Sequence, residues 1–321
     1  MQIVDIAFWA SVLSIAMAAG TSLVYAAVGE IFAEKSGVLN LGVEGMMIMG
    51  AVTGFAAAYH SGNVLIGVVT GGIVGGFMAL IHCFVTITLL ADQVVSGLAI
   101  TLLGGGLASF LGQRLGVDGT PLVGLIGPRL LEIPIPYMSD IAYIGDVLFN
   151  RDMMTYLLYI VVPLVAFYIR RTRPGLFLRA VGENPQAADV MGVDVVKCRY
   201  FYTVMGGVFA GLGGVHLSLS YTPGWTESIT GGRGWIAVAL VIFATWDPIR
   251  SVFGALLFGG VNAIQFRMQA VGTNVPAALL NMLPYLLTIV VLVIITYFEG
   301  LRKKLGAPDA LGLPYIREER V

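Results

Sequence analysis

The sequence predicts an all-α membrane protein, a polytopic transmembrane helical bundle with about nine spans. The 321 residues are 57% hydrophobic and only 12% charged, whereas soluble domains carry about 25% charged residues. Several apolar stretches reach the roughly 20 residues that a spanning helix needs. Their hydrophobicity is continuous rather than alternating, which argues against a closed β-barrel. The 42 glycines suit the close approach of helices in lipid.

The apolar stretches follow one another along the chain and are separated by polar turns. A polar break at 31–37 separates the first two spans, and the turn 91–93 separates the third from the fourth. The stretch 235–246 is too short to cross a membrane unless it is tilted or broken, so the count is open by one. The predicted spans are 10–30, 38–59, 64–90, 94–110, 153–169, 201–221, 235–246, 251–268 and 277–297.

Two longer segments lack the apolar character of a span. Residues 112–152 hold four prolines and five acidic residues and are expected to form a long loop, ordered at least in part. Residues 170–200 form the longest polar island and carry six of the 18 basic residues. We find no strict repeat and no soluble domain, so residues 1–321 are expected to form a single transmembrane domain.

Charge placement sets the expected orientation, because cytoplasmic loops of membrane proteins are enriched in Lys and Arg. When the basic loop 170–200 is placed inside and the spans alternate, the inside segments hold 13 of the 18 Lys and Arg. The N-terminus then lies outside and the C-terminus lies inside, with the loop 112–152 on the outer side. The basic residues left outside are Arg114, Arg129, Arg151, Arg233 and Arg267.

A short helix with strong boundary signals lies in the middle of the basic loop. Asn184 can accept a hydrogen bond from a free backbone N–H, and Pro185 suits the first helical position. Gly192 can adopt the left-handed backbone that ends a helix. The helix would have about two turns and would be unstable alone in water. A capped short helix in a basic loop indicates a surface on which a cytoplasmic motor subunit docks. The alternative is an ordinary ordered loop.

Polar residues within the spans indicate where a translocation path could run. Asn40 and Glu44 are four residues apart and would share one face of a helix. The glycines around them favour a broken helix at the path, because unwound backbone is tolerated where it lines water. The alternatives are a structural pairing of Glu44 with another helix and a position of Glu44 near the inner interface. Elsewhere, single polar residues serve as readily in helix-to-helix contacts. The further candidates are Gln93, Ser96, Thr101, Asn262, Gln265 and Asn281.

Aromatic and polar residues after the sixth span mark the expected outer end of the path. Tyr221, Trp225 and Trp235 lie there together with Arg233. Aromatic residues at this level usually form the interfacial belt of a membrane protein. A gate, or a surface that stacks on a ring-bearing solute, is the alternative interpretation.

The sequence lacks the motifs of an ATPase, a metalloenzyme or a nucleophilic enzyme. It contains no Gly-x-x-x-x-Gly-Lys-Ser/Thr loop and no His-Glu-x-x-His pair. Cys83 and Cys198 have no metal-ligand spacing and are expected to be unpaired. We therefore expect no enzyme activity and no cofactor or metal bound by this chain, and nothing indicates a nucleic-acid partner.

Five motifs follow one another over nearly the whole chain: EKSGVLNLGVEGMM (34–47), DQVVSGLA (92–99), AVGENP (180–185), GRGWIA (232–237) and MLPYL (282–286). With these motifs the sequence resembles the permease subunits of bacterial ABC importers for simple sugars and nucleosides, in their nucleoside-type branch. Thr245 and Trp246 are a mild departure, because most relatives have a small or glycine pair before this turn.

The resemblance implies a type II-like importer fold in the bacterial cytoplasmic membrane, and it implies partners. Two ABC ATPase subunits would bind ATP and Mg, a second permease subunit would complete the pair, and an extracytoplasmic binding (lipo)protein would deliver the solute. A heterodimer of two permeases is favoured over a homodimer. The short helix would be the coupling helix that seats in the ATPase. The residues expected at this contact are Gly182, Glu183, Asn184, Pro185, Ala187, Ala188, Asp189, Met191 and Gly192.

The function implied is a translocation path for a nucleoside or a similar small ring-bearing solute. A simple sugar and riboflavin remain alternative solutes. An ion-coupled secondary transporter is a second hypothesis, for which Glu44 is the one good carboxylate candidate inside a span, and a channel or scaffold is a third. The residues expected to line the path are Asn40, Glu44, Gln93, Ser96, Tyr221, Trp225, Arg233, Asn262 and Asn281.

Overall fold

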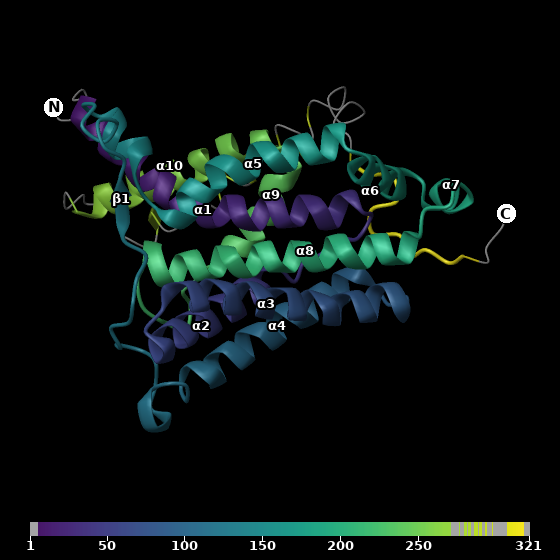
Figure 1. Cartoon of the computed structure of the whole chain (residues 1–321), viewed down its shortest axis with the longest axis horizontal. Helices are drawn as coiled ribbons and strands as arrows, with labels where there is room; N and C mark the ends of the chain where they lie inside the picture. Colours follow the sequence, from purple (N-terminus) through teal and green to yellow (C-terminus); the bar gives the residue numbers. More distant parts are fainter. Residues whose placement is uncertain are drawn as a thin grey trace.

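A computed structural model shows an elongated bundle of α-helices that run between two ends (Figure 1). The structure describes residues 6–270, 276, 279–280, 282–283, 286–287, 289–290, 293, 297 and 307–317. The α-helices are α1 (Ile6–Lys35), α2 (Val43–Ser61), α3 (Val64–Cys83), α4 (Gln93–Gly112), α5 (Met153–Arg171), α6 (Arg173–Glu183), α7 (Pro185–Val190), α8 (Val195–His216), α9 (Arg233–Phe243) and α10 (Pro248–Ala270).

Short irregular elements complete the fold. Two π-helical turns, η1 (Phe84–Thr88) and η4 (Leu217–Tyr221), continue α3 and α8. Between α4 and α5 lie the 3₁₀ turn η2 (Val117–Gly119), the π-helical turn η3 (Gly145–Phe149) and a two-stranded antiparallel sheet. Its strands are β1 (Glu132–Pro134) and β2 (Asn150–Asp152).

The all-α class is confirmed, but the count of about nine spans is not. Within the described residues, six helices are long and apolar enough to cross a membrane. The 19-residue helix α2 is not among these six, and α9 is a short apolar helix of 11 residues. The expected span 277–297 lies mostly outside the described residues. The six are Ile6–Lys35, Val64–Thr88, Gln93–Gly112, Met153–Arg171, Val195–Tyr221 and Pro248–Gln269.

Glycine-mediated packing around α8 forms the centre of the bundle. This helix packs against α1, α2 and α3, and Figure 1 shows it running alongside α1 and α3. A Cβ at Gly214 would overlap the backbone of Met47 in α2, and one at Gly75 would overlap the backbone of α8 at Gly207. Backbones can approach this closely only where no side chain separates them, which confirms the expected use of glycine.

The polar break predicted at 31–37 is wrong, because α1 remains helical to Lys35. Glu and Lys are good helix formers, so their polarity does not end the helix. The helix ends before Gly37, which takes a left-handed φ of +86°. The chain then runs in non-helical backbone to Gly42, where α2 begins. We call residues 36–42 the interrupted segment.

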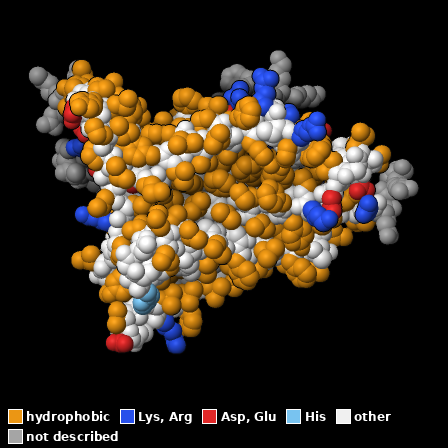
Figure 2. Space-filling model, viewed as in Figure 1, with side chains coloured by type: hydrophobic (Ala, Val, Ile, Leu, Met, Phe, Trp, Pro, Cys, Tyr) orange, Lys and Arg blue, Asp and Glu red, His pale blue; other side chains and the backbone are white. Residues whose placement is uncertain are grey.

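Several turns and loops gather at the two ends of the bundle. At one end Gly182 packs against Lys35, Arg170 pairs with Asp247, and the described C-terminal residues 307–317 fold back onto Gly37. At the other end the Leu130 N–H donates to the Leu219 carbonyl at 2.8 Å, which joins the long loop to η4. Apolar side chains cover the flank between the two ends, and charged side chains lie toward the ends (Figure 2).

Candidate functional site

The most distinctive polar contact of the bundle joins the first turn of α2 to the start of α9. The Glu44 Oε1 atom accepts hydrogen bonds from the Thr230 hydroxyl at 2.6 Å and from the Gly232 N–H at 2.9 Å. Its Oε2 atom accepts from the Gly234 N–H at 2.6 Å. A carboxylate is stabilised at the N-terminus of a helix by free N–H groups and by the helix dipole. Glu44 therefore caps α9 from a different helix.

Glycines make this joint possible. Gly231 and Gly232 both have left-handed backbone, with φ of +53° and +80°, so the chain can turn sharply into α9. A Cβ at Gly234 would overlap the backbone of Glu44. The joint between α2 and α9 is therefore a direct backbone contact that tolerates no side chain at residue 234.

A polar and aromatic cavity of about 370 Å³ lies beside this joint. Arg233, the first residue of α9, donates from Nη1 to the Ala19 carbonyl at 3.0 Å and lies over the Tyr221 ring, 4.8 Å from its centroid. Sites for small molecules commonly combine apolar walls with a few polar groups. The lining residues are Tyr221, Thr222, Ile229, Thr230, Gly231, Arg233, Ile236, Asn262, Gln265 and Phe266.

The structure brings four of the expected path residues together and leaves the others elsewhere. Tyr221, Arg233 and Asn262 line the cavity, and Glu44 adjoins it through Thr230. Trp225 is only 1% exposed and packs against Gly112 at the end of α4. A belt position for Trp225 is therefore wrong, because its ring is inside the protein. Asn281 lies outside the described residues.

Asn40, Gln93 and Ser96 belong to a second, buried network around the interrupted segment. The Leu39 N–H donates to Gln93 Oε1 at 2.7 Å, and the Leu39 carbonyl lies 3.2 Å from His82 Nε2. His82 Nδ1 lies 2.9 Å from the Ser96 hydroxyl. These side chains replace the backbone partners that a helix would have supplied.

Asn40 lies within the interrupted segment, so its predicted sharing of a helix face with Glu44 is wrong. Its N–H donates to Glu30 Oε1 at 3.1 Å, and its own side-chain oxygen accepts from the Gly42 N–H at 3.0 Å. The two residues lie on either side of the start of α2.

Glu30 and Glu34 are buried polar residues that the sequence analysis missed. Both are 1% exposed on α1, and Glu34 accepts a hydrogen bond from the Trp246 indole N–H at 2.5 Å. Thr245 and Trp246 each have a left-handed φ of +55°, which glycine adopts without cost and other residues do not. The indole bond to Glu34 helps to hold this turn. The sequence signal that could have identified this pair is the four-residue spacing of Glu30 and Glu34, which places both carboxyl groups on one face of α1.

The expected coupling residues form a compact unit at the end of the bundle where Gly182 packs against Lys35. The Asn184 side chain accepts from the Ala187 N–H at 2.9 Å, Pro185 begins α7, and Gly192 has a left-handed φ of +86°. These three local predictions are confirmed. Val190 and Met191 are 87% and 82% exposed, so α7 ends in an apolar tip. Helix α6 is not among the predicted elements, although Thr172 and Pro174 signal its start.

An ion pair at this same end joins the last turn of α5 to the turn before α10. Arg170 pairs with Asp247, the residue that precedes α10. Burial raises the pKa of Asp247, but the hydrogen bond and charge of Arg170 act together with hydrogen bonds from the Ile249 and Arg250 N–H groups and hold the pKa of this carboxyl below its usual value. The pair fixes the end of α5 to the turn between α9 and α10.

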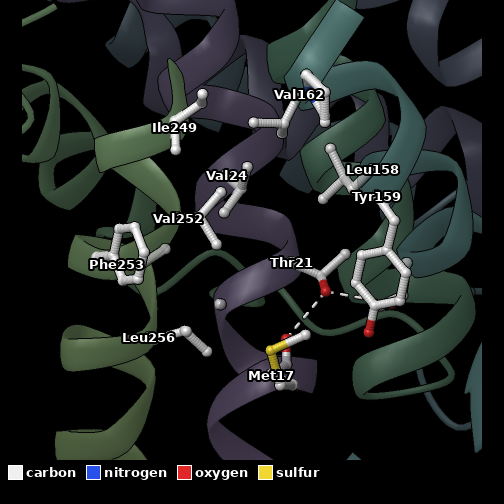
Figure 3. Close-up of a pocket in the computed structure, with 14 residues that line it drawn as sticks. Met17, Thr21, Val24, Leu158, Tyr159, Val162, Ile249, Val252, Phe253 and Leu256 are labelled. Carbon is white, nitrogen blue, oxygen red and sulfur yellow. Dashed lines mark hydrogen bonds between the residues drawn. The ribbon is translucent and has the colours of Figure 1, made fainter. Parts of the chain in front are cut away.

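A separate apolar groove of about 330 Å³ runs between α5 and α10, with α1 as its floor (Figure 3). Thr21 is a polar residue on this floor. Its hydroxyl donates to the Met17 carbonyl at 2.9 Å and lies 3.1 Å from the Thr155 hydroxyl. None of the expected path residues lines this groove. The groove is therefore distinct from the polar cavity.

Comparison with known proteins agrees with this architecture. The family described as branched-chain amino acid transport system / permease component matches residues 12–292. The chain is 41% identical to TsgC13 of Haloferax volcanii, provisionally named a glucose ABC transporter permease protein, over 97% of this chain and 99% of that protein.

Two further relatives carry the names of nucleoside permeases. The guanosine ABC transporter permease protein NupQ of Bacillus subtilis is 34% identical over 93% of this chain and 94% of its own length. The nucleoside ABC transporter permease protein NupC of Lactococcus lactis is 33% identical with the same coverage. With a family match over most of its length and three full-length relatives of this kind, the chain belongs to the permease-component family of ABC transporters.

Proposed function

We propose that this chain forms the translocation path of an importer for a nucleoside or a similar ring-bearing solute. The observation that carries the proposal is the joint at Glu44, where α9 begins inside the bundle beside a polar cavity. Interrupted helices whose N-termini face a cavity are typical of transporter binding sites, because non-helical backbone is tolerated there. Glu44 is the structural partner of this interruption rather than a ligand of the solute.

The chemistry of the cavity suits a neutral polar solute with a flat ring. Tyr221 and Phe266 offer aromatic faces, Arg233 offers a guanidinium group, and Asn262 offers an amide. The names of NupQ and NupC favour a nucleoside, whereas the name of TsgC13 favours a sugar as the alternative. Riboflavin is a further alternative, because it also carries a flat ring system.

Energy for import would come from separate subunits. Two ABC ATPases would bind ATP and Mg, and this chain itself would hold no cofactor and catalyse no reaction. The exposed tip of α7 would seat in the ATPase, with Val190 and Met191 as its apolar contacts. A second permease, favoured as a different chain rather than a copy, and an extracytoplasmic binding protein would complete the transporter in the cytoplasmic membrane.

Uptake by membrane vesicles containing the complete transporter tests this proposal. We expect nucleoside uptake to stop with vanadate and to survive dissipation of the proton and sodium gradients, because ATP hydrolysis is the driving force. An ATPase should co-purify with the permease. Uptake that resists vanadate but stops with the gradients would contradict the proposal and would favour an ion-coupled secondary transporter.

A further inference from the structure

The described C-terminal residues 307–317, which we call the C-terminal tail, connect two elements that are far apart in sequence. The Ala310 N–H donates to the Gly182 carbonyl at 2.9 Å, next to the start of α7. The Gly312 N–H donates to the Gly37 carbonyl at 3.2 Å, at the start of the interrupted segment. Two backbone groups of one short stretch are therefore bonded to the coupling unit and to the segment that leads to Glu44.

The tail also supplies part of the seat of α7. Tyr315 is buried in a small apolar cluster with Val181, Ala188 and Val195, which come from α6, α7 and α8. A helix of six residues is far below the length that is stable alone. The buried face of α7 therefore depends on these neighbours, and the Tyr315 ring is the largest of them. The Arg317 guanidinium adds an ion pair with Asp189 of α7 at 3.5 Å.

A buried arginine ties the tail to α8. Arg199 is 2% exposed, and its Nη1 atom donates to the Leu313 carbonyl at 3.0 Å. Among the described residues its Nε and Nη2 atoms have no hydrogen-bond partner. Burying a guanidinium is costly unless it is hydrogen-bonded. The Leu313 carbonyl thus stabilises a charge that the bundle would otherwise leave uncompensated, which holds the tail in one position.

We propose that the C-terminal tail is a strap that positions α7 for its ATPase partner and joins α7 to the interrupted segment, with Tyr315 as the main positioning residue. The inference rests on the proposed function, because it assigns the tail a part in coupling ATP hydrolysis to uptake. Tyr315 touches neither solute nor nucleotide and acts through the placement of α7.

The test compares three variants of the complete transporter in vesicles. Tyr315→Ala removes the ring, Tyr315→Phe keeps the ring and removes only the hydroxyl, and Ile316→Ala is the matched control at a neighbouring exposed residue. For Tyr315→Ala we expect solute uptake per ATP hydrolysed to fall on the order of tenfold, the size of a typical coupling between sites. We expect Tyr315→Phe and Ile316→Ala to retain the wild-type ratio.

Membrane abundance and melting temperature of the permease separate this outcome from misfolding. An unchanged ratio of uptake to ATP hydrolysis in Tyr315→Ala would overturn the proposal. If the proposed function itself were wrong, the wild-type transporter would show uptake that resists vanadate. That result does not depend on any tail variant, so the two failures can be told apart.

A cross-link keeps the proposal falsifiable if Tyr315→Ala does not fold. Cysteines replace Asp189 and Arg317 in a Cys198→Ser background, and a short cleavable bis-thiol reagent joins them. Because the tail and α7 are proposed to move as one unit, we expect linking to leave unchanged the uptake rate that the same double-cysteine transporter has before the reagent is added. Loss of uptake on linking, restored by cleavage and absent from the two single-cysteine controls, would show that the tail must leave α7 and would overturn the strap.

Discussion

Both oxygens of the Glu44 carboxylate are occupied by donors from the chain that enters α9. In Glu44→Gln one oxygen becomes an NH₂ group that faces a donor, and a buried N–H without an acceptor costs about 1–3 kcal/mol. We expect initial uptake to fall on the order of tenfold, since 1.4 kcal/mol is a factor of about ten, while the ATPase still co-purifies. Glu132→Gln, at an exposed residue of β1, is the matched control. Unchanged uptake in Glu44→Gln would remove Glu44 from the transport cycle.

Gly234 offers a second residue-scale prediction, which concerns packing rather than hydrogen bonding. In Gly234→Ala the new methyl group would overlap the Glu44 backbone, so α9 must move away from α2. Overpacking of this kind typically costs about 1–3 kcal/mol. We expect a lower melting temperature and reduced uptake. In Gly260→Ala, within α10, the methyl group meets nothing within 4 Å, and we expect both measurements to stay at the wild-type values; equal behaviour of the two variants would contradict the close joint.

Local rules explain which residues the sequence could identify. Asn184, Pro185 and Gly192 act on backbone groups only a few residues away, so their roles follow from spacing alone. Glu30 and His82 both bond to the backbone of the interrupted segment. The glycines there predict a broken helix, but not which side chains would bond to its backbone. Those roles depend on tertiary placement and could not be derived from spacing.

At the scale of elements, α7 is a short helix with one buried face and one exposed face. Pro185 and Ala188 are buried, whereas Ala187 is exposed. Combining Pro185→Gly with Ala187→Asp loosens the helix start and adds a charge to the exposed face, at a cost to folding of about 1 kcal/mol for the proline change. We expect ATP hydrolysis to continue while uptake falls, because the ATPase contact is altered and the bundle is not.

A charge of the same kind at the other end of the molecule is the control for this double variant. Ala142→Asp lies in an exposed part of the long loop, and we expect it to leave the ratio of uptake to ATP hydrolysis unchanged. Wild-type uptake in the double variant would show that α7 is not the coupling contact.

Helix ends were harder to predict than helix existence, and α1 and α9 show why. Polarity at Glu34 and Lys35 predicts a break, although both residues favour helix and the true end is set by Gly37. The brevity of α9 was recognised, but its cap comes from α2, more than 180 residues earlier in the chain. Apolar length predicts that a span exists, whereas the point at which it ends depends on contacts across the bundle.

At the scale of the whole molecule, the turns divide between two ends, and the end that holds α6 and α7 carries most of the basic residues of the central loop. The positive-inside rule predicts that this end lies in the cytoplasm. Single cysteines in a Cys198→Ser background test the orientation, since the remaining Cys83 is buried. The two reporters are Tyr137→Cys in the long loop and Val190→Cys on α7, at positions 90% and 87% exposed.

We expect a membrane-impermeant thiol reagent to label Tyr137→Cys in intact cells and to label Val190→Cys only after permeabilisation. The Cys198→Ser background without a reporter should stay unlabelled in both conditions. A cytoplasmic ATPase can reach α7 only from inside, so the coupling role of α7 requires this orientation. Labelling of Val190→Cys in intact cells would place α7 outside, and no rearrangement of the ATPase contact could then preserve the mechanism.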